Sequence, residues 1–499
     1  MKVAVLADLH LPARSDTVKE SILDWALTAA VEHNADLIAG AGDLTSLGEL
    51  ASARRIMQKL QTVNLPFIHA PGNAELRTPA DSKAVLELMS TPSIFPGTVA
   101  VDSSHRKLSE ASSALLQELL DSNHRNLLLI SHCPPAAWEE QDLELLSELI
   151  DKKIISRVVY GHRHIDIEDG INSCIRGLDP DKASGGAPAL VFFTREPDGS
   201  WKREDVVCPL ADAAGFPKKI RRNILDSIGI SGMKTPLENL ALAIEKKLPV
   251  FEIRFAGNAD FPSPELREAV ALWRKNGGRY LSMHLVDLVF DGKNFSGMEM
   301  LHTAVCAAIK LGCDGVTFHV PRGFADELNN PATLARAAKI VSDCFRELFE
   351  HNISVGVENL HTSAAEREQK RYKFGCLPDE CMAFINALRE LNPGKKIGLH
   401  LDIGHARNNA PFSNKSTLSD WYAACGKEIV AMHIHQVSMD ENGTLKNHTG
   451  FTDFYGKLIS LSSLAMARRS GSIGAVPMIL ELRAPAEDSL HTLQKVLMP

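Results

Sequence analysis

The chain has no long hydrophobic run. None of its 499 residues lies in an apolar stretch approaching the roughly 20 residues that a membrane-spanning helix needs. The apolar start at residues 1–7 meets Asp8 and His10 too early for a signal peptide, and therefore predicts a buried strand. Composition is otherwise ordinary for a globular protein, with 44% hydrophobic residues, 23% charged residues and a mean hydropathy of -0.08. We therefore expect no membrane partner.

Cysteine and aromatic residues are also scarce. The nine cysteines are scattered and odd in number, which fits a reducing cytoplasm better than a disulfide framework. Residues 1–215 contain only 20 Lys and Arg against 31 Asp and Glu, while the remainder is close to neutral. With no recognisable basic, aromatic-rich groove, this acidic first part argues against long-range attraction to nucleic acid. Bound divalent ions would offset part of that charge locally.

The length of the chain exceeds what one ordinary hydrophobic core supports, so it predicts two domains. A boundary is expected near residues 206–222, where Pro209, Gly215 and Pro217 precede the basic run 218–222. The predicted domains are residues 1–210 and 218–499. We found no low-complexity tract between or within them.

Both parts of the chain are predicted to be α/β, because short apolar runs alternate with helical stretches. In the first part the predicted strands are 3–7, 36–40, 66–70, 126–131, 157–160 and 189–194. In the second part they are 224–230, 250–255, 280–285, 315–320, 353–358, 397–403, 429–436 and 477–482. Helices are expected between them, for example at 298–311 and 332–351. Eight alternating units over about 280 residues predict a (β/α)8 TIM barrel.

Five phrases in the first part place seven potential metal ligands directly after predicted strands. They are Asp8-Leu9-His10, Gly42-Asp43, Gly72-Asn73-Ala74-Glu75, Ser131-His132 and Gly161-His162-Arg163-His164. Hard carboxylate and amide oxygens combined with imidazoles suit two divalent ions. Ions about 3.5–4 Å apart can clamp the attacking and leaving oxygens of a displacement at phosphorus.

These phrases resemble the calcineurin-like metallophosphoesterase family over about 200 residues, with all five motifs in order. The resemblance implies an α/β sandwich and two ions, Mn²⁺, Zn²⁺ or Fe²⁺. It implies that Asp43 bridges the ions, and that Asn73 and His132 orient the one that polarises the phosphoryl oxygen. The implied ligands are Asp8, His10 and His164 for one ion and Asn73, His132 and His162 for the other.

Ala74 departs from the family pattern, which has histidine at this place. That histidine stabilises the transition state or protonates the leaving group, a contribution of about 10²–10⁴-fold that alanine cannot make. Some branches of the family lack it and still hydrolyse phosphodiesters with good leaving groups. Three interpretations remain open: a diesterase with a narrowed substrate range, a slow enzyme, or a metal-binding regulatory domain.

Six consecutive predicted barrel strands, the third to the eighth, deliver metal-binding side chains at or just after their carboxyl ends, where TIM-barrel sites lie. A ring of carboxylates and imidazoles there suits Zn²⁺, Mn²⁺ or Mg²⁺, because charged groups in a barrel mouth must be paired or metal-bound. The candidate ligands are His284, His319, Glu358, Asp402, His405, His433, His435, His448 and Glu481. Of these, His433 and His435 are expected on the seventh strand and His448 in the loop after it.

These residues resemble the superfamily that endonuclease IV shares with the xylose isomerase-like isomerases and epimerases. Endonuclease IV holds three zinc ions with nine residues, eight of which have counterparts here. The ninth, an aspartate, is replaced by Lys446, which weighs against a third ion. The isomerases hold one ion with the equivalents of Glu358, Asp402, a seventh-strand histidine and Glu481, and move a proton with the two glutamates. One to three ions are therefore expected in the barrel.

The first functional hypothesis is a two-domain metal-dependent phosphoester hydrolase, a phosphodiesterase or nuclease acting on nucleic acid or nucleotides. His284 and His319 favour it, because a one-metal isomerase does not require them. Arg254, Arg322 and the segment 366–373 are the local candidates for phosphate contacts. The alternatives are a sugar or sugar-phosphate isomerase or epimerase fused to a phosphatase, and a chain in which one domain is only a metal-stiffened scaffold.

Overall fold

The computed structural model describes residues 1–89, 93–182, 187–212, 215–233, 235–257, 260–439, 444–451 and 459–497. The chain forms two compact units. The first comprises Met1–Gly215 with Ser460–Met466, and the second comprises Phe216–Ile459 with Ala467–Pro499. Among the described residues, every helix is too short or too polar to span a lipid bilayer.

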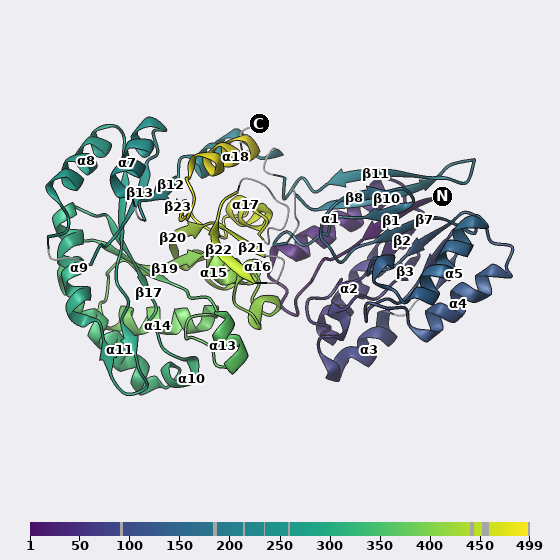
Figure 1. Cartoon of the computed structure of the whole chain (residues 1–499), viewed down its shortest axis with the longest axis horizontal. Coiled ribbons are helices and arrows are strands. Elements are labelled where there is room, and N and C mark those ends of the chain that lie inside the picture. Colours follow the sequence, from purple (N-terminus) through teal and green to yellow (C-terminus); the bar gives the residue numbers. More distant parts are fainter. Residues whose placement is uncertain are drawn as a thin grey trace. The chain divides into compact units, whose positions relative to one another are not determined.

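Two β-sheets form the centre of the first unit (Figure 1). One has the strand order β11-β10-β1-β2-β3, and the other has the order β4-β5-β6-β7-β9-β8. The first sheet contains β1 (Lys2–Leu6), β2 (Leu37–Gly40), β3 (Phe67–His69), β10 (Ala189–Arg195) and β11 (Trp201–Val207). The second contains β4 (Ile94–Phe95), β5 (Thr98–Ala100), β6 (Leu127–Ile130), β7 (Ile155–Tyr160), β8 (Ile167–Asp169) and β9 (Asn172–Cys174).

Alternating side chains of β1 pack on opposite faces of its sheet, as the two-residue period of a strand requires. Val3 and Val5 join the core shared with the second sheet, which includes Ile130. Leu6 packs on the other face with helix residues such as Ile22. The helices are α1 (Val18–Glu32), α2 (Leu50–Thr62), α3 (Pro79–Met89), α4 (Glu110–Leu120) and α5 (Glu140–Asp151). Since α4 and α5 pack on the second sheet, the unit is an α/β sandwich of four layers, as expected.

A short segment from late in the chain completes the first unit. Ser460 N donates to Asp181 O at 3.0 Å, and Ser463 N donates to Pro180 O at 3.2 Å. Met466 is buried in the same apolar cluster as the outer face of β1. A cut between the two units at residues 210–218 would therefore remove part of the first unit.

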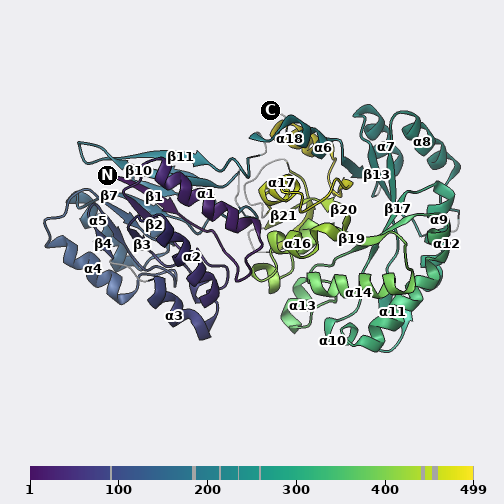
Figure 2. The ribbon, with the colours of Figure 1, turned by 180° about the vertical axis from the view of Figure 1, so that it is seen from behind.

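The second unit is a closed barrel of eight parallel strands, which confirms the predicted TIM barrel. Helices α7, α8, α9, α11 and α14 surround it (Figures 1 and 2). Its strands are β12 (Ile228–Ser231), β13 (Val250–Arg254), β14 (Tyr280–His284), β17 (Gly315–His319), β18 (Ser354–Glu358), β19 (Ile397–Asp402), β20 (Ile429–Ile434) and β23 (Met478–Leu480). The first strand begins later than residue 224, because Ile224 belongs to the preceding helix α6 (Lys218–Leu225).

The longer barrel helices are α7 (Pro236–Glu245), α8 (Pro264–Lys275), α9 (Met298–Leu311), α11 (Pro331–Cys344), α14 (Pro378–Leu391) and α18 (Glu487–Leu497). Shorter ones are α10 (Ala325–Leu328), α12 (Arg346–Glu350), α13 (Ala364–Gln369), α15 (Ile403–Arg407) and α16 (Leu418–Cys425). Helix α17 (Ser462–Arg469) begins in the segment Ser460–Met466, which belongs to the first unit. The single helix predicted at 332–351 is interrupted at Phe345, whose buried ring packs edge-on against Phe318 with centroids 5.2 Å apart.

Two hairpins extend the barrel: β15 (Val289–Phe290) with β16 (Phe295–Ser296), and β21 (Gln436–Met439) with β22 (Leu445–Thr449). The second corrects two expectations. His435 lies just after β20 and not within the seventh strand, and His448 lies on β22 and not in a loop. The hairpin pairs Gln436 with Thr449, which brings the two histidines together.

Candidate metal centres

The seven candidate ligands of the first unit follow the carboxyl ends of parallel strands in its two sheets. Asp8 and His10 follow β1, which is parallel to β2, and β2 is followed by Asp43. The backbone fixes this pairing, because Asp8 N donates to Gly42 O and His10 N donates to Asp43 O, both at 3.0 Å. The structure brings all seven side chains into two adjoining groups.

The first group contains Asp8, His10 and His164, the three residues that the family resemblance implied for one ion. His10 Nε2 lies 3.3 Å from His164 Nε2, and His164 Nε2 lies 3.7 Å from Asp8 Oδ1. Asp8 and His10 are buried. In the described part of the chain neither Asp8 Oδ1 nor His10 Nδ1 has a hydrogen-bond partner.

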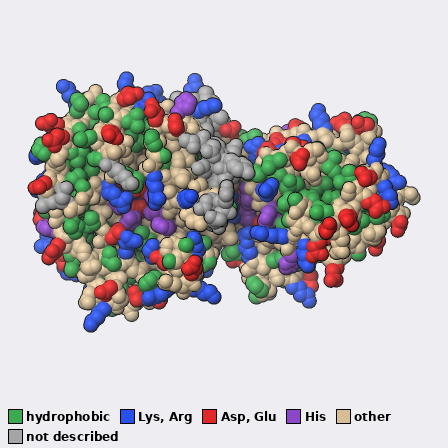
Figure 3. All heavy atoms as spheres, in the orientation of Figure 1, with side chains coloured by type: hydrophobic (Ala, Val, Ile, Leu, Met, Phe, Trp, Pro, Cys, Tyr) green, Lys and Arg blue, Asp and Glu red, His purple; other side chains and the backbone are tan. Residues whose placement is uncertain are grey.

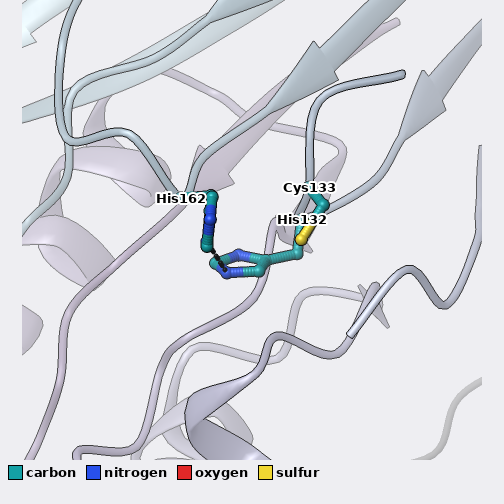
Figure 4. A group of neighbouring side chains, drawn as sticks. All are labelled: His132, Cys133 and His162. Carbon is teal, nitrogen blue, oxygen red and sulfur yellow. Dashed lines mark hydrogen bonds between the residues drawn. The ribbon is translucent and has the colours of Figure 1, made fainter. Parts of the chain in front are cut away.

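The second group contains Asn73, His132 and His162. His132 Nε2 and His162 Nδ1 lie 3.1 Å apart (Figure 4), and Asn73 Oδ1 lies 3.2 Å from His132 Nε2. With its amide turned over, Asn73 would instead donate to both imidazoles. In either orientation a polar atom of Asn73 meets two imidazole nitrogens, which is the arrangement of donor atoms around an ion.

Asp43 lies between the two groups. Its Oδ2 is 3.7 Å from His10 Nε2, and its Oδ1 is 3.4 Å from His132 Nε2. One carboxylate oxygen therefore faces each group. This is the geometry that a carboxylate shared by two ions requires.

The backbone of this site is strained. Asp8, His10, Asp43, His162 and His164 have φ between 48° and 68°, the left-handed region that residues other than glycine rarely adopt. Such conformations cost about 1–3 kcal/mol each and persist only where the surrounding structure imposes them. Five of the seven candidate ligands share this feature, which indicates a site held in place by its loops.

Close packing and one buried carboxylate hold these loops. A Cβ on Gly161 would lie 2.4 Å from Asp8 Oδ2, and one on Gly72 would lie 2.3 Å from Asp43 Oδ1. Glu75 is fully buried and accepts hydrogen bonds from the backbone N–H of Asp43 at 3.0 Å and of Gly72 at 2.8 Å. Sequence analysis quoted Glu75 only as part of a motif and missed this role.

The protonation of the first group fits divalent ions. Burial raises the pKa of Asp8 to about 8, against the opposing charge of His132, and it lowers the pKa of His10 well below its usual range. His10 is therefore neutral, the form that binds metals, and a nearby dication would keep Asp8 ionised. Ion binding would offset the desolvation free energy of this buried carboxylate.

At position 74 the structure places an apolar, fully buried side chain next to the carboxylate of Asp43. Ala74 N donates to Asp43 Oδ1 at 2.6 Å, and the methyl group offers no proton. Arg77 brings a cation to the site: its Nη2 lies 3.8 Å from Asp43 Oδ2, and its side chain is one-quarter exposed. Cys133 also borders the second group (Figure 4), and burial raises the pKa of its thiol to about 11.

In the barrel, one group of ligands forms around Glu358 at the end of β18. His284 Nε2 lies 3.1 Å and His319 Nε2 lies 3.3 Å from Glu358 Oε2. His319 Nδ1 lies 2.7 Å from Asp287 Oδ1, and Arg322 Nη1 donates to Asp287 Oδ2 at 2.8 Å. Sequence analysis did not identify Asp287, which fixes the orientation of the His319 ring.

A second barrel group contains Glu358, Asp402, His433 and Glu481. His433 Nδ1 lies 3.1 Å from Glu358 Oε1, 3.3 Å from Glu481 Oε2 and 3.8 Å from Asp402 Oδ2. Glu358, Asp402 and His433 are fully buried. The sequence left open which imidazole of the His433-Ile434-His435 segment belongs here, and the geometry selects His433.

A third barrel group consists of His405, His435 and His448, whose ligand atoms lie within 4.8 Å of one another. His435 Nε2 also lies 3.0 Å from Asp402 Oδ1, which connects this group to the second. Lys446 is exposed at the surface of β22, so its charge opposes an ion here less than a buried lysine would. His435 provides the third imidazole where the sequence lacks an acidic ligand.

The barrel site also contains a carboxylate that sequence analysis missed. Glu252 on β13 is fully buried, and its Oε1 lies 2.8 Å from His433 Nε2. Burial acts to raise the pKa of Glu252, but the charge and hydrogen bond of His433 outweigh it and lower the pKa to about 2. A lone acidic residue inside the apolar run Val250–Arg254 was the available signal, because a strand rarely buries a charge without a partner.

Comparison with known proteins gives a family for part of the chain. Residues 1–166, about a third of the sequence, match the family model of calcineurin-like phosphoesterases. No curated protein matches.

Solved structures similar to the chain include a putative xylose isomerase from Rhodospirillum rubrum, with 17% identity, a TM-score of 0.42, and coverage of 54% of this chain and 97% of that one. A 3-keto-D-glucoside 4-epimerase from E. coli has 17% identity, a TM-score of 0.34, and coverage of 54% and 98%. A dimetal phosphatase from Danio rerio has 14% identity, a TM-score of 0.30, and coverage of 39% and 92%. These likenesses are too distant to carry an argument about function.

Proposed function

We propose that the chain is a metal-dependent phosphoester hydrolase whose first unit cleaves phosphodiester bonds. One observation carries this proposal: Asp43 directs one carboxylate oxygen toward each of two ligand groups. Both groups lie within the stretch that matches the calcineurin-like phosphoesterase model. Divalent ions bound there would lower the pKa of water and neutralise charge on the phosphoryl oxygens.

The protein's own residues contribute positioning and charge. Asp43 would hold the two ion sites at a fixed separation, and Asn73 and His132 would orient the ion next to the phosphoryl oxygen. Glu75 keeps the loop that carries Asp43 in register through two backbone N–H groups. Arg77 supplies a fixed positive charge that can attract an anionic substrate.

The buried methyl group of Ala74 narrows the range of substrates. No side chain at this position can protonate a leaving group, so the site depends on leaving groups that depart as stable anions. We propose phosphodiesters of nucleotides or nucleic acids as the substrate class. Their sugar hydroxyls are poor leaving groups, so without an acid at position 74 we expect them to be cleaved slowly.

The test uses the full chain loaded with Mn²⁺ and two diesters that differ in leaving group, bis-p-nitrophenyl phosphate and a dialkyl phosphate. We expect hydrolysis of bis-p-nitrophenyl phosphate and no hydrolysis of the dialkyl phosphate. Ala74→His should raise the rate on the poorer substrate by about 10²-fold or more, the usual contribution of a general acid. Absence of hydrolysis by both proteins would overturn the proposal, and Asp43→Ala controls for contaminating activity.

For the barrel we propose phosphoester hydrolysis as well. His284 and His319 both contact Glu358 Oε2 and would be superfluous around a single ion. Arg254 lies 3.8 Å from Glu481, and Arg322 contacts Asp287, and both guanidinium groups are about half exposed. Figure 3 shows histidine side chains on the face of the barrel unit with Lys and Arg around them. Such cations suit a phosphate-bearing substrate.

The alternative is a sugar isomerase or epimerase that uses Glu358 and Glu481 for proton transfer. Metal analysis of an Asp8→Ala/Asp43→Ala chain, in which the barrel ligands are intact, distinguishes the hydrolase from the isomerase. More than one ion, together with incision of a duplex that contains an abasic site, is expected for the hydrolase. A single Mn²⁺ or Mg²⁺ with no incision would favour the isomerase.

A further inference from the structure

Glu252 occupies the interior of the barrel beside the candidate metal ligands without belonging to the ligand groups around Glu358. Its carboxylate lies in the middle of β13, on the strand next to β14. Oε1 contacts His433 Nε2 at 2.8 Å. Oε2 accepts hydrogen bonds from Ser282 Oγ at 3.1 Å and Thr317 Oγ1 at 2.7 Å.

This carboxylate is the centre of a network that spans several strands. Thr317 Oγ1 also lies 3.0 Å from His400 Nδ1, and the His400 ring lies 4.1 Å from that of His433. Ser282, Thr317, His400 and Glu252 are all buried. Both oxygens of Glu252 are therefore occupied, and neither is available to a substrate.

We propose that Glu252 is a positioning residue for the barrel's metal centre, an inference that rests on the metal-dependent function proposed above. An imidazole has two nitrogen atoms, and a hydrogen bond at one determines which way the other faces. With Nε2 held by Glu252, His433 presents Nδ1 to Glu358, Asp402 and Glu481. A carboxylate behind a metal-binding histidine also increases the basicity of that ligand.

The pair formed by Asp287 and His319 shows what is distinctive about Glu252. Asp287 is partly exposed, and Arg322 neutralises it at 2.8 Å. The described contacts of Glu252 are instead two neutral hydroxyl groups and His433. Its charge therefore acts on the ligand it holds, and removing that charge should weaken ion binding more than losing one of the hydroxyl donors.

The test measures metal affinity in the full chain carrying Asp8→Ala and Asp43→Ala, so that the ions counted belong to the barrel. In this background Glu252→Gln keeps a hydrogen-bond acceptor near His433 but removes the charge. We expect its affinity for Zn²⁺ to fall about 10–100-fold in competition with a chelating dye, the usual effect of such partners. The visible spectrum of the Co²⁺-loaded protein should also shift. Ser282→Ala is the matched control, and its affinity should stay within about twofold.

Equal affinities of Glu252→Gln and the background protein would overturn the positioning role. If the background protein itself binds no ion, the proposed barrel function fails. This result differs from equal affinities, which would overturn only the role of Glu252. Thermal unfolding of the metal-free proteins shows whether the substitution damages the fold. If Glu252→Gln does not fold, Glu252→Asp tests the same point: it keeps the charge but withdraws it from His433, and unchanged affinity again contradicts the proposal.

Discussion

The two candidate metal centres of this chain hold similar ligands by different means. In the first unit, five of seven ligands lie in loops with left-handed backbone, and glycines pack directly against two carboxylates. In the barrel the ligands lie at strand ends, on a short helix and on a hairpin, and among its nine candidates only His448 has a positive φ. There, Glu252 and Asp287 accept hydrogen bonds from His433 and His319 and orient these two imidazoles.

This difference follows from the two folds. The ligands of the first unit come from the strand ends of two separate sheets, so the chain must turn sharply to direct short side chains at a common point. A closed barrel already points every strand at one mouth, so regular backbone suffices and only the side-chain torsions need to be fixed. Apart from the ligands themselves, we therefore expect substitutions that disturb loop packing to damage the first centre, and substitutions that disturb imidazole orientation to damage the second.

The largest effect is expected from Asp43→Ala. Both ligand groups of the first unit lose their shared carboxylate, so hydrolysis of bis-p-nitrophenyl phosphate should fall by more than about 100-fold. This exceeds the roughly 10–100-fold loss typical of a residue that only positions a ligand. The measurements are the hydrolysis rate and the metal content of the purified full chain. Retention of the full rate would locate the hydrolysis elsewhere in the chain.

Gly161→Ala tests the backbone-held centre more sharply. The new Cβ would lie 2.4 Å from Asp8 Oδ2, so the carboxylate must move, and metal affinity of the first unit should fall about 10-fold or more. Gly474→Ala is the control, because nothing lies within 4 Å of its added Cβ. Isothermal titration with Mn²⁺ measures both proteins. A normal affinity for Gly161→Ala would contradict the role assigned to packing.

Asp287→Asn tests the side-chain-held centre. His319 keeps a neighbouring acceptor but loses the charged one at 2.7 Å. We expect barrel ion affinity to fall by about 10-fold, less than for Glu252→Gln, because Asp287 is already neutralised by Arg322. Competition with a chelating dye in the Asp8→Ala/Asp43→Ala background gives the value. A larger loss than for Glu252→Gln would reverse the ranking of the two carboxylates.

Metal removal should give the smallest measurable change, in thermal stability. Glu252, Glu358, Asp402 and Glu481 are all buried in the barrel, so after chelation the neighbouring imidazoles must balance most of their charge. Ions present at 100 times their dissociation constant stabilise a fold by about 2.7 kcal/mol. Calorimetry of the full chain with and without a chelator should therefore show the barrel transition moving down by several degrees. An unchanged transition would indicate a site that binds ions weakly.

Much of the fold could be predicted from the sequence. All eight barrel strands, and the six predicted strands of the first unit, are found where their apolar runs lie, because burial on both faces leaves a clear pattern. The ends of some elements differ from the prediction: Ile224 belongs to helix α6 and not to the first barrel strand, and the helix predicted at 332–351 is interrupted at Phe345. The hairpin that joins His435 to His448 was not predicted, because residues 445–449 lack the alternating apolar pattern of a strand, although the pairing itself is local.

By itself the sequence determined the fold class, the succession of strands along the chain and the residue types at the strand ends, because these depend on the local hydrophobic pattern. Only the tertiary structure decided which ligands meet. It set Asp43 between two groups, selected His433 over His435 for the centre at Glu358, and placed Glu252 and Asp287 behind two imidazoles. The physical reason is that a metal centre depends on distances of a few ångströms between residues from separate strands, and strand register, barrel closure and loop strain fix those distances.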